Sequence, residues 1–138
     1  MKYKFISHTA DIKFQAFGKN LEECFVSAFK ALQEIMFKDL DIKKIKTSKK
    51  IKIEIKGLDK ENLLYNFLEE FLFLLEAKNF LSVEIKKIKI EGNILKAEII
   101  GAKATDYNFS NEVKAITYND LFIKKEKNNY ICQVVLDV

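Results

Sequence analysis

The stretch 64–75 constrains the fold more than any other part of the chain. Its apolar residues recur at helical spacing, and Phe73 and Leu74 widen the apolar face. Gly57 ends the preceding segment, and Asp59 is suited to cap the first turn of this helix. A helix with so broad an apolar face has to lie on a sheet or be covered by a partner, and core packing is the commoner case. We therefore predict a central helix packed on a sheet.

Another amphipathic helix is predicted earlier in the chain. Residues 2–6 and 12–17 have the character of a strand pair. Asn20 then provides an N-cap, with Glu23 three residues later as in a capping box. Apolar residues at helical spacing continue to about Phe37. The apolar face of this helix also needs a sheet or another helix to cover it.

Strand patterns dominate the rest of the chain. Isoleucine alternates with charged residues over 51–56, which is typical of a half-buried strand. Gly92-Asn93 separates two strand-like segments and indicates a two-residue hairpin. Two long strands follow over about 112–126 and 129–136. We expect them to be joined at Asn128-Asn129, because asparagine tolerates the left-handed conformation of a tight turn.

These elements follow one another in the order β-β-α-β-α-β-β-β-β, without a linker or an internal repeat. The order predicts a two-layer α+β domain over residues 1–138, with two helices on one side of a mainly antiparallel sheet. A chain of 138 residues is long enough to bury a core without disulfides or structural metals. Cys24 and Cys132 lie in apolar helical and strand patterns, so we expect buried thiols.

The basic residues are all lysine, and the net charge is +4. Without arginine the chain lacks the planar guanidinium group that forms paired hydrogen bonds with bases and phosphates, so sequence-specific recognition of nucleic acid is disfavoured. Lysine can still follow a phosphate backbone as a point charge. The densest basic run lies over 43–56, where lysines alternate with isoleucine from residue 51 onward. A strand with a solvated face therefore explains the run better than a nucleic-acid patch.

Nothing in the sequence indicates a membrane location. The longest apolar run, Phe71–Leu75, is far too short to span a bilayer. The first residues lack the pattern of a secretory signal. We therefore expect a cytoplasmic protein with no membrane contact.

A polar stretch over 7–12 separates the first two predicted strands and offers His8, two hydroxyls and Asp11. Loops that carry such groups between strands are common places for sites, although an ordinary turn with side chains bonded to their own backbone has the same composition. Asp137 and the last residue, Val138, follow the final predicted strand. If that strand ends near Asp11, three carboxylates converge: the side chains of Asp11 and Asp137 and the final carboxylate on Val138.

Converging carboxylates repel one another unless a cation neutralises them. Ligands that are all oxygen favour Ca²⁺, Mg²⁺ or Mn²⁺ over zinc. The alternative is that the terminal acids are simply solvated. Lys114 and Thr117 add polar groups to an otherwise strand-forming segment, 113–119. Lys114 is then either a surface charge or a contact to phosphate or to the carboxylates.

Five short blocks, in the same order from Tyr3 to the last residue, resemble the archease family. The blocks are His8-Thr9-Ala10-Asp11-Ile12, Asn20-Leu21-Glu22-Glu23, Asn62-Leu63-Leu64-Tyr65, Lys114-Ala115-Ile116-Thr117-Tyr118 and Val134-Val135-Leu136-Asp137-Val138. The resemblance implies a small α+β protein that is not itself a catalyst. It implies a partner, an RtcB-type RNA ligase that joins tRNA halves after intron removal, and contact with tRNA through that ligase. Archeases promote the GTP- and metal-dependent guanylylation of the ligase, which allows repeated turnover.

The resemblance also implies roles for individual residues. The family's metal site, seen with calcium, corresponds here to Asp11, Asp137 and Val138. Lys114 matches the lysine implicated in activating the ligase, and we expect His8 and Thr117 in the matching blocks to take part.

Two positions depart from the family pattern. Asn119 stands where the family usually has histidine, and Ala102 follows Gly101 where the family commonly has glutamate. Asparagine keeps hydrogen bonding but does not titrate near neutral pH.

Two other functions are compatible with the sequence. One is a metal-dependent hydrolase with Asp11 and Asp137 as ligands and His8 as general base. His8 is the one histidine of the chain, which gives this alternative little support. The other is a lysine-rich RNA-binding or chaperone-like module, whose RNA affinity would fall steeply with salt through the lysines of 43–56.

Overall fold

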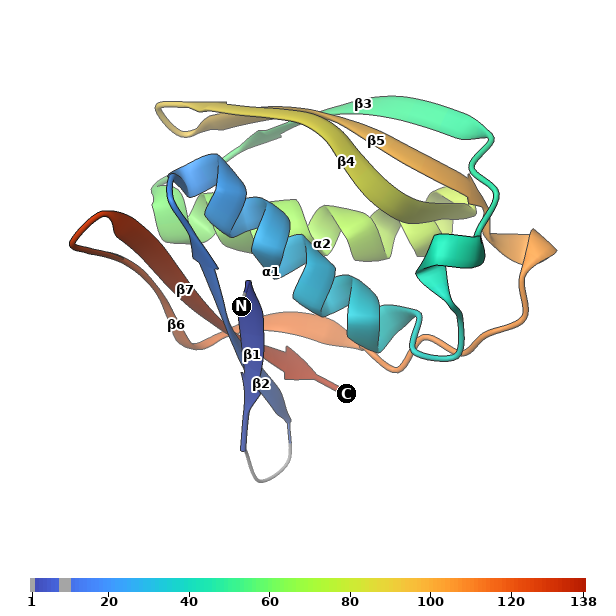
Figure 1. The fold of residues 1–138 in the computed structure, drawn as a ribbon, viewed down its shortest axis with the longest axis horizontal. Helices are drawn as coiled ribbons and strands as arrows, with labels where there is room; N and C mark the ends of the chain where they lie inside the picture. Colours follow the sequence, from blue (N-terminus) through green and yellow to red (C-terminus); the bar gives the residue numbers. More distant parts are fainter. Residues whose placement is uncertain (1, 8–10) are drawn as a thin grey trace.

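The structure is a computed structural model that describes residues 2–7 and 11–138 (Figure 1). In chain order the elements are β1 (Tyr3–Ile6), β2 (Ile12–Gly18), α1 (Leu21–Met36), the 3₁₀ turn η1 (Ile42–Lys44), β3 (Lys49–Lys56), α2 (Lys60–Lys78), β4 (Phe80–Glu91), β5 (Ile94–Lys103), the 3₁₀ turn η2 (Ala104–Asp106), β6 (Ala115–Glu126) and β7 (Asn129–Asp137). The predicted α+β class and the predicted order of strands and helices are confirmed.

The strands form two sheets, and every strand pair is antiparallel. The first sheet has the order β1-β2-β7-β6, and the second sheet has the order β3-β5-β4. Both helices lie between them, so the molecule has three layers where the sequence predicted two (Figure 1). The broad apolar faces explain the difference, because α1 contacts β2 and β4, and α2 contacts β6 and β4. Each helix therefore buries apolar surface against both sheets.

Aromatic rings hold the helix layer together. Phe25 of α1 packs on Phe67 of α2 with ring centroids 5.5 Å apart, and Phe29 packs on Phe71 at 4.5 Å. All four rings are buried. Burying such a side chain stabilises a fold by roughly 1.5–3 kcal/mol, and an aromatic pair adds about 0.5–1.5 kcal/mol. These rings fix the two helices against each other.

Both predicted helix caps are present. The Asn20 side chain accepts a hydrogen bond from the Glu23 amide at 2.8 Å, and the Asp59 side chain accepts one from the Asn62 amide at 2.7 Å. Each cap satisfies an amide that would otherwise lack a partner in the first turn.

The hairpin at Gly92-Asn93 also forms, with Gly92 at a φ of 59°. The last turn is one residue earlier than predicted. Glu126 pairs with Asn129 and Lys127 takes the positive φ of 52°, so the turn is Lys127-Asn128. The prediction assigned the left-handed position to asparagine on propensity, whereas strand register sets it here. Within the described part of the chain, no helix has the length and apolarity needed to cross a bilayer.

Candidate functional site at the end of the first sheet

The register of the first sheet places the candidate site residues at one end of it. Strand β7 lies between β2 and β6. Ile12 of β2 pairs with Leu136, and Ala115 of β6 pairs with Asp137. Asp11, which comes just before Ile12, therefore lies beside the end of β7 that carries Asp137. Lys114 reaches the same end, because its backbone amide donates to the Asp137 carbonyl oxygen at 2.7 Å.

The end of β7 combines an anchor with an exposed carboxylate. Leu136 is buried, and the half-buried side chain of Val138 packs against the hydrophobic core. Asp137 lies between them in sequence and is exposed. Apolar contacts on either side therefore fix the backbone from which the Asp137 carboxylate projects into solvent.

The donors that come together are oxygen atoms. Among residues 2–7 and 11–138, no three His, Cys, Asp or Glu side chains lie close enough together to hold a metal ion. Asp11 and Asp137 offer two side-chain carboxylates at this end of the sheet, and the main-chain oxygen of Val138 would add a third oxygen ligand. This donor set fits a hard cation that retains water, and it does not fit structural zinc.

The two other expected residues that the structure describes, Lys114 and Thr117, differ in their surroundings. Lys114 is exposed beside Asp137. The Thr117 hydroxyl donates to the Val135 carbonyl oxygen at 3.0 Å and accepts from the Asn119 amide at 3.3 Å. Thr117 thus braces the backbone where β6 leaves regular pairing. The predictions that involve His8 fall outside the described residues.

A large bulge in β6 was not predicted from the sequence. Thr117 pairs with Val135, yet the next pair joins Phe122 to Gln133. Residues 118–121 therefore stand opposite one residue of β7, and the regular pairing of β6 is interrupted there. Bulges of this kind re-aim side chains and are common beside functional sites.

Polar contacts hold the bulge across the first sheet. Asp120 has a φ of 55°, and its carboxylate accepts from the Lys13 ammonium at 3.2 Å. The Gln133 side-chain amide donates to the Asp120 carbonyl oxygen at 2.9 Å and accepts from Gln15 at 3.0 Å. The bulge is thus tied to β2 over the intervening strand β7.

The bulge also brings two of the five sequence blocks into contact. Tyr118 stacks on Tyr65 of α2, with ring centroids 4.1 Å apart and planes 8° apart. The Asn62 side-chain amide donates to the Tyr118 hydroxyl. Burial, followed by the neighbouring Glu69, raises the pKa of Tyr65. Sequence reasoning noted both blocks but did not predict that they touch.

The two departures from the family pattern have different settings. Ala102 is buried in β5 opposite Leu81, where a carboxylate would be costly without a partner. Asn119 is exposed in the bulge, one residue after Tyr118. Replacement at position 102 therefore affects packing, whereas replacement at position 119 changes the surface.

The model of the Archease protein family matches residues 3–138. The chain belongs to the archease family. The archease of Methanosarcina barkeri is 36% identical over 143 residues, which cover 99% of this chain and 96% of that protein. The archease of Archaeoglobus fulgidus is 33% identical over 140 residues and covers 100% of both chains. The resemblance inferred from the five sequence blocks is therefore confirmed.

Solved structures agree with this assignment to the archease family. The solution structure of Methanobacterium thermoautotrophicum protein 1598 matches with a TM-score of 0.82, 30% identity and coverage of 99% of each chain. The crystal structure of a Thermotoga maritima protein, described as an archease and possible chaperone, matches with a TM-score of 0.69. At 23% identity, over 98% of this chain and 96% of that one, the second match supports the fold alone.

Proposed function

We propose that this archease-family protein is a non-catalytic accessory factor that activates an RtcB-type tRNA-splicing RNA ligase. In this proposal it promotes the GTP-dependent guanylylation of the ligase and so sustains multiple turnover. The observation that carries the proposal is the register of β2, β7 and β6, which brings Asp11, Asp137 and Lys114 to one end of the first sheet. Such an end is suited to insertion into a partner's pocket, because its groups are positioned before contact.

In the proposed mechanism, the end of the first sheet enters the nucleotide pocket of the ligase. Asp11, Asp137 and a main-chain oxygen of Val138 would hold a hard divalent cation, Ca²⁺, Mg²⁺ or Mn²⁺, which would attract phosphate oxygens. Lys114 would offset the negative charge of GTP as its phosphates are ordered. The protein would act in the cytoplasm with the ligase and would contact tRNA through it.

The test is multiple-turnover ligation of tRNA halves by the ligase of the same organism, with GTP and Mn²⁺. Catalytic amounts of this protein should raise turnover, and Asp137→Ala and Lys114→Ala should not. Asp106→Ala is the matched control, because Asp106 is an exposed aspartate in η2, outside the gathered set. It should activate like the wild type.

Full activation by a folded Asp137→Ala protein would overturn the assigned site. Unchanged turnover with an active ligase would overturn the function itself. Hydrolysis by the isolated protein, lost in His8→Ala, would instead identify the metal-dependent hydrolase.

A further inference from the structure

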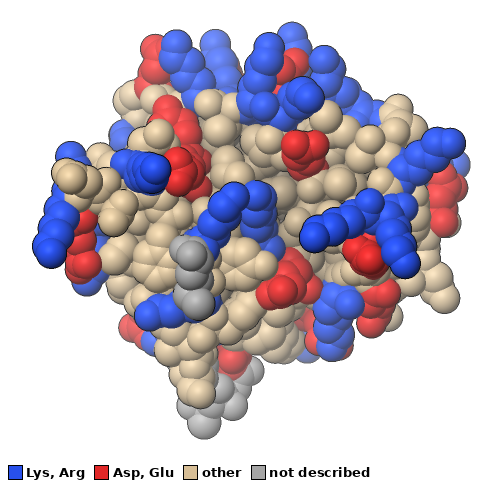
Figure 2. All heavy atoms as spheres, in the orientation of Figure 1, with Lys and Arg blue, Asp and Glu red and all other residues tan. Residues whose placement is uncertain are grey.

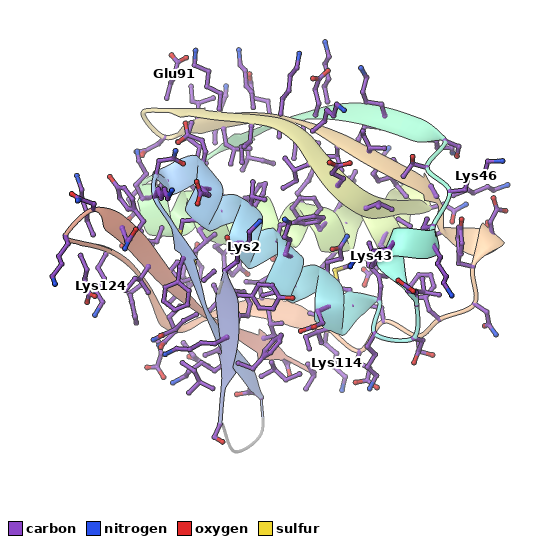
Figure 3. All side chains as sticks on the ribbon, viewed as in Figure 1. Lys2, Lys43, Lys46, Glu91, Lys114 and Lys124 are labelled. Carbon is purple, nitrogen blue, oxygen red and sulfur yellow. The ribbon has the colours of Figure 1, made fainter. Side chains whose placement is uncertain are left out.

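The outer face of the second sheet, which points away from the helices, is rich in lysine. Its inner face is apolar, because Ile53, Ile55, Leu95, Ala97 and Ile99 belong to the core. The exposed lysines of the outer face come from all three strands: Lys50, Lys52 and Lys56 of β3, Lys96 of β5, and Lys86, Lys87 and Lys89 of β4. Figure 3 shows side chains of this sheet projecting away from the helix layer, and Figure 2 shows lysines gathered above it.

The acidic side chains on this face neutralise the lysines only loosely. Glu98 is shared by Lys50 and Lys87, each with its nitrogen 3.6 Å from a carboxylate oxygen, and Lys52 stands opposite Glu98 in the register. Lys96 lies 3.6 Å from Glu54. The lysine side chains in these pairs are 59–79% exposed. Exposed ion pairs of this kind are weak, so these lysines can turn to another anion at little cost.

One cross-strand pair on this face is unfavourable in the free protein. Lys89 of β4 stands directly opposite Lys96 of β5. Like charges placed directly opposite each other destabilise a sheet. Glu91 offsets part of this repulsion through its contact with Lys89 at 2.9 Å. A bound polyanion would relieve the rest.

The shape of the face suits an extended strand of phosphates. An open depression of about 710 Å³ runs across the three strands, lined by Lys52, Lys87, Lys89 and Lys96, by Glu54 and Glu98, and by Ile53, Ile88 and Ala97 at its floor. Alternate residues of a strand are about 6.6 Å apart, and neighbouring strands are about 4.8 Å apart. The ammonium groups therefore form a grid over which a flexible phosphate backbone can run.

We infer that this lysine face binds the phosphate backbone of single-stranded RNA without regard to sequence. The depression lacks the aromatic or arginine anchors that dominate protein interfaces, which argues against an acidic protein partner. Its apolar lining residues, Ile53, Ile88 and Ala97, belong to the core or pack against it, so they do not project as the apolar side chains with which a peripheral protein inserts into a membrane. Distributed lysine charge is what backbone binding requires. The inference goes beyond the proposed function and does not depend on it.

The test is fluorescence anisotropy of a labelled oligouridine titrated with the full chain over a series of KCl concentrations. Binding should weaken linearly on a log–log plot, by about 0.7 in slope for each phosphate contacted. The triple variant Lys52→Gln, Lys87→Gln, Lys96→Gln should bind at least about tenfold more weakly at low salt, with a slope less negative by about 2.

A second triple variant is the matched control. Lys124, Lys125 and Lys127 are exposed around the β6–β7 turn, and their change to glutamine removes the same charge. This variant should keep the wild-type slope. Equal losses in both variants, or no binding by the wild type, would overturn the inference. If the first triple variant does not fold, Lys52→Gln and Lys87→Gln alone should each change the slope by about 0.7, and an unchanged slope would overturn it.

The last part of the test measures binding of the protein to vesicles that contain phosphatidylserine. Binding to vesicles that is tighter than binding to RNA, and is lost in the same triple variant, would assign the face to anionic membranes and overturn RNA as its ligand. None of these measurements includes the ligase, so their failure is distinct from a failure of the proposed activation.

Discussion

The two sheets cover the same helix layer, but their outer faces carry different side chains. On the first sheet, Gln15 donates a hydrogen bond to Gln133, and Gln133 donates one to the Asp120 carbonyl oxygen of the β6 bulge. Val135, on this outer side, is fully buried. The second sheet leaves its outer face to water and covers it with charged side chains. The first sheet's outer face is thus partly covered and hydrogen-bonded, whereas the second sheet's outer face is open and charged.

This difference indicates which kind of binding each outer face can support. A covered face with satisfied polar groups holds strand ends in fixed positions, which suits the residues gathered around Asp137. An open face of lysines has little geometric precision but a strong field, which suits a ligand recognised by charge alone. Because the helix layer contacts both sheets, we predict that the two sheets unfold as one unit.

The largest predicted effect tests that shared layer. Phe67→Ala should lower the free energy of unfolding by about 3–5 kcal/mol, because Phe67 is fully buried against Phe25 and Phe71. Urea denaturation should still show one transition, with hydrogen exchange rising in both sheets. Phe73→Ala is the control on the same helix: its side chain is 49% exposed, and the loss should be below about 1 kcal/mol. Separate transitions for the two sheets would contradict a single folding unit.

A smaller effect contrasts the two outer faces directly. Gln133→Met should cost about 1–3 kcal/mol, because the partly buried Asp120 carbonyl and the Gln15 amide both lose a partner. Lys96→Met, at an outer-face position of an interior strand in the second sheet, should change stability by less than about 0.5 kcal/mol. Urea denaturation measures both. Equal losses would show that the first sheet's outer face is no more ordered than the second's.

The smallest effect is a pH dependence on the lysine face. Burial raises the pKa of Glu98, but the charges of Lys50, Lys87 and Lys52 outweigh it and hold the pKa below its usual value. A lowered folded-state pKa stabilises the protein above the unfolded-state pKa, and this stability is lost as the pH falls through the folded-state value. Stability should therefore fall less steeply in acid for Glu98→Gln than for the wild type, and 1 M salt should remove the difference. Identical acid limbs at low salt would contradict this account of Glu98.

Local chemistry made much of the fold predictable. The caps at Asn20 and Asp59, the hairpin at Gly92-Asn93 and the order of elements all follow from residues close together in sequence. The division into two sheets does not, because it depends on how much apolar helix surface remains after one sheet is covered. The prediction placed the last turn one residue too late for a similar reason. The pairing register of β6 and β7 sets the turn at Lys127-Asn128, whatever the turn propensity of asparagine.

The site was predictable only in part. Strand order and register bring Asp11 beside Asp137, which meets the condition that the sequence alone could not decide. The bulge after Thr117 and the stacking of Tyr118 on Tyr65 depend on contacts between residues far apart in the chain. Periodicity carries no signal for such contacts. The lysine face was visible only as the run over 43–56, because β4 and β5 supply the rest of it.

The most direct test of the central claim is the rate at which the ligase forms its covalent GMP adduct, measured with labelled GTP and Mn²⁺ and without RNA. The wild type and Asp106→Ala should accelerate adduct formation equally, because activation is assigned to the end of the first sheet. Asp137→Asn, which keeps the shape of the side chain and removes its charge, should leave the rate at that of the ligase alone. Acceleration by a folded Asp137→Asn protein equal to that of the wild type would contradict the account.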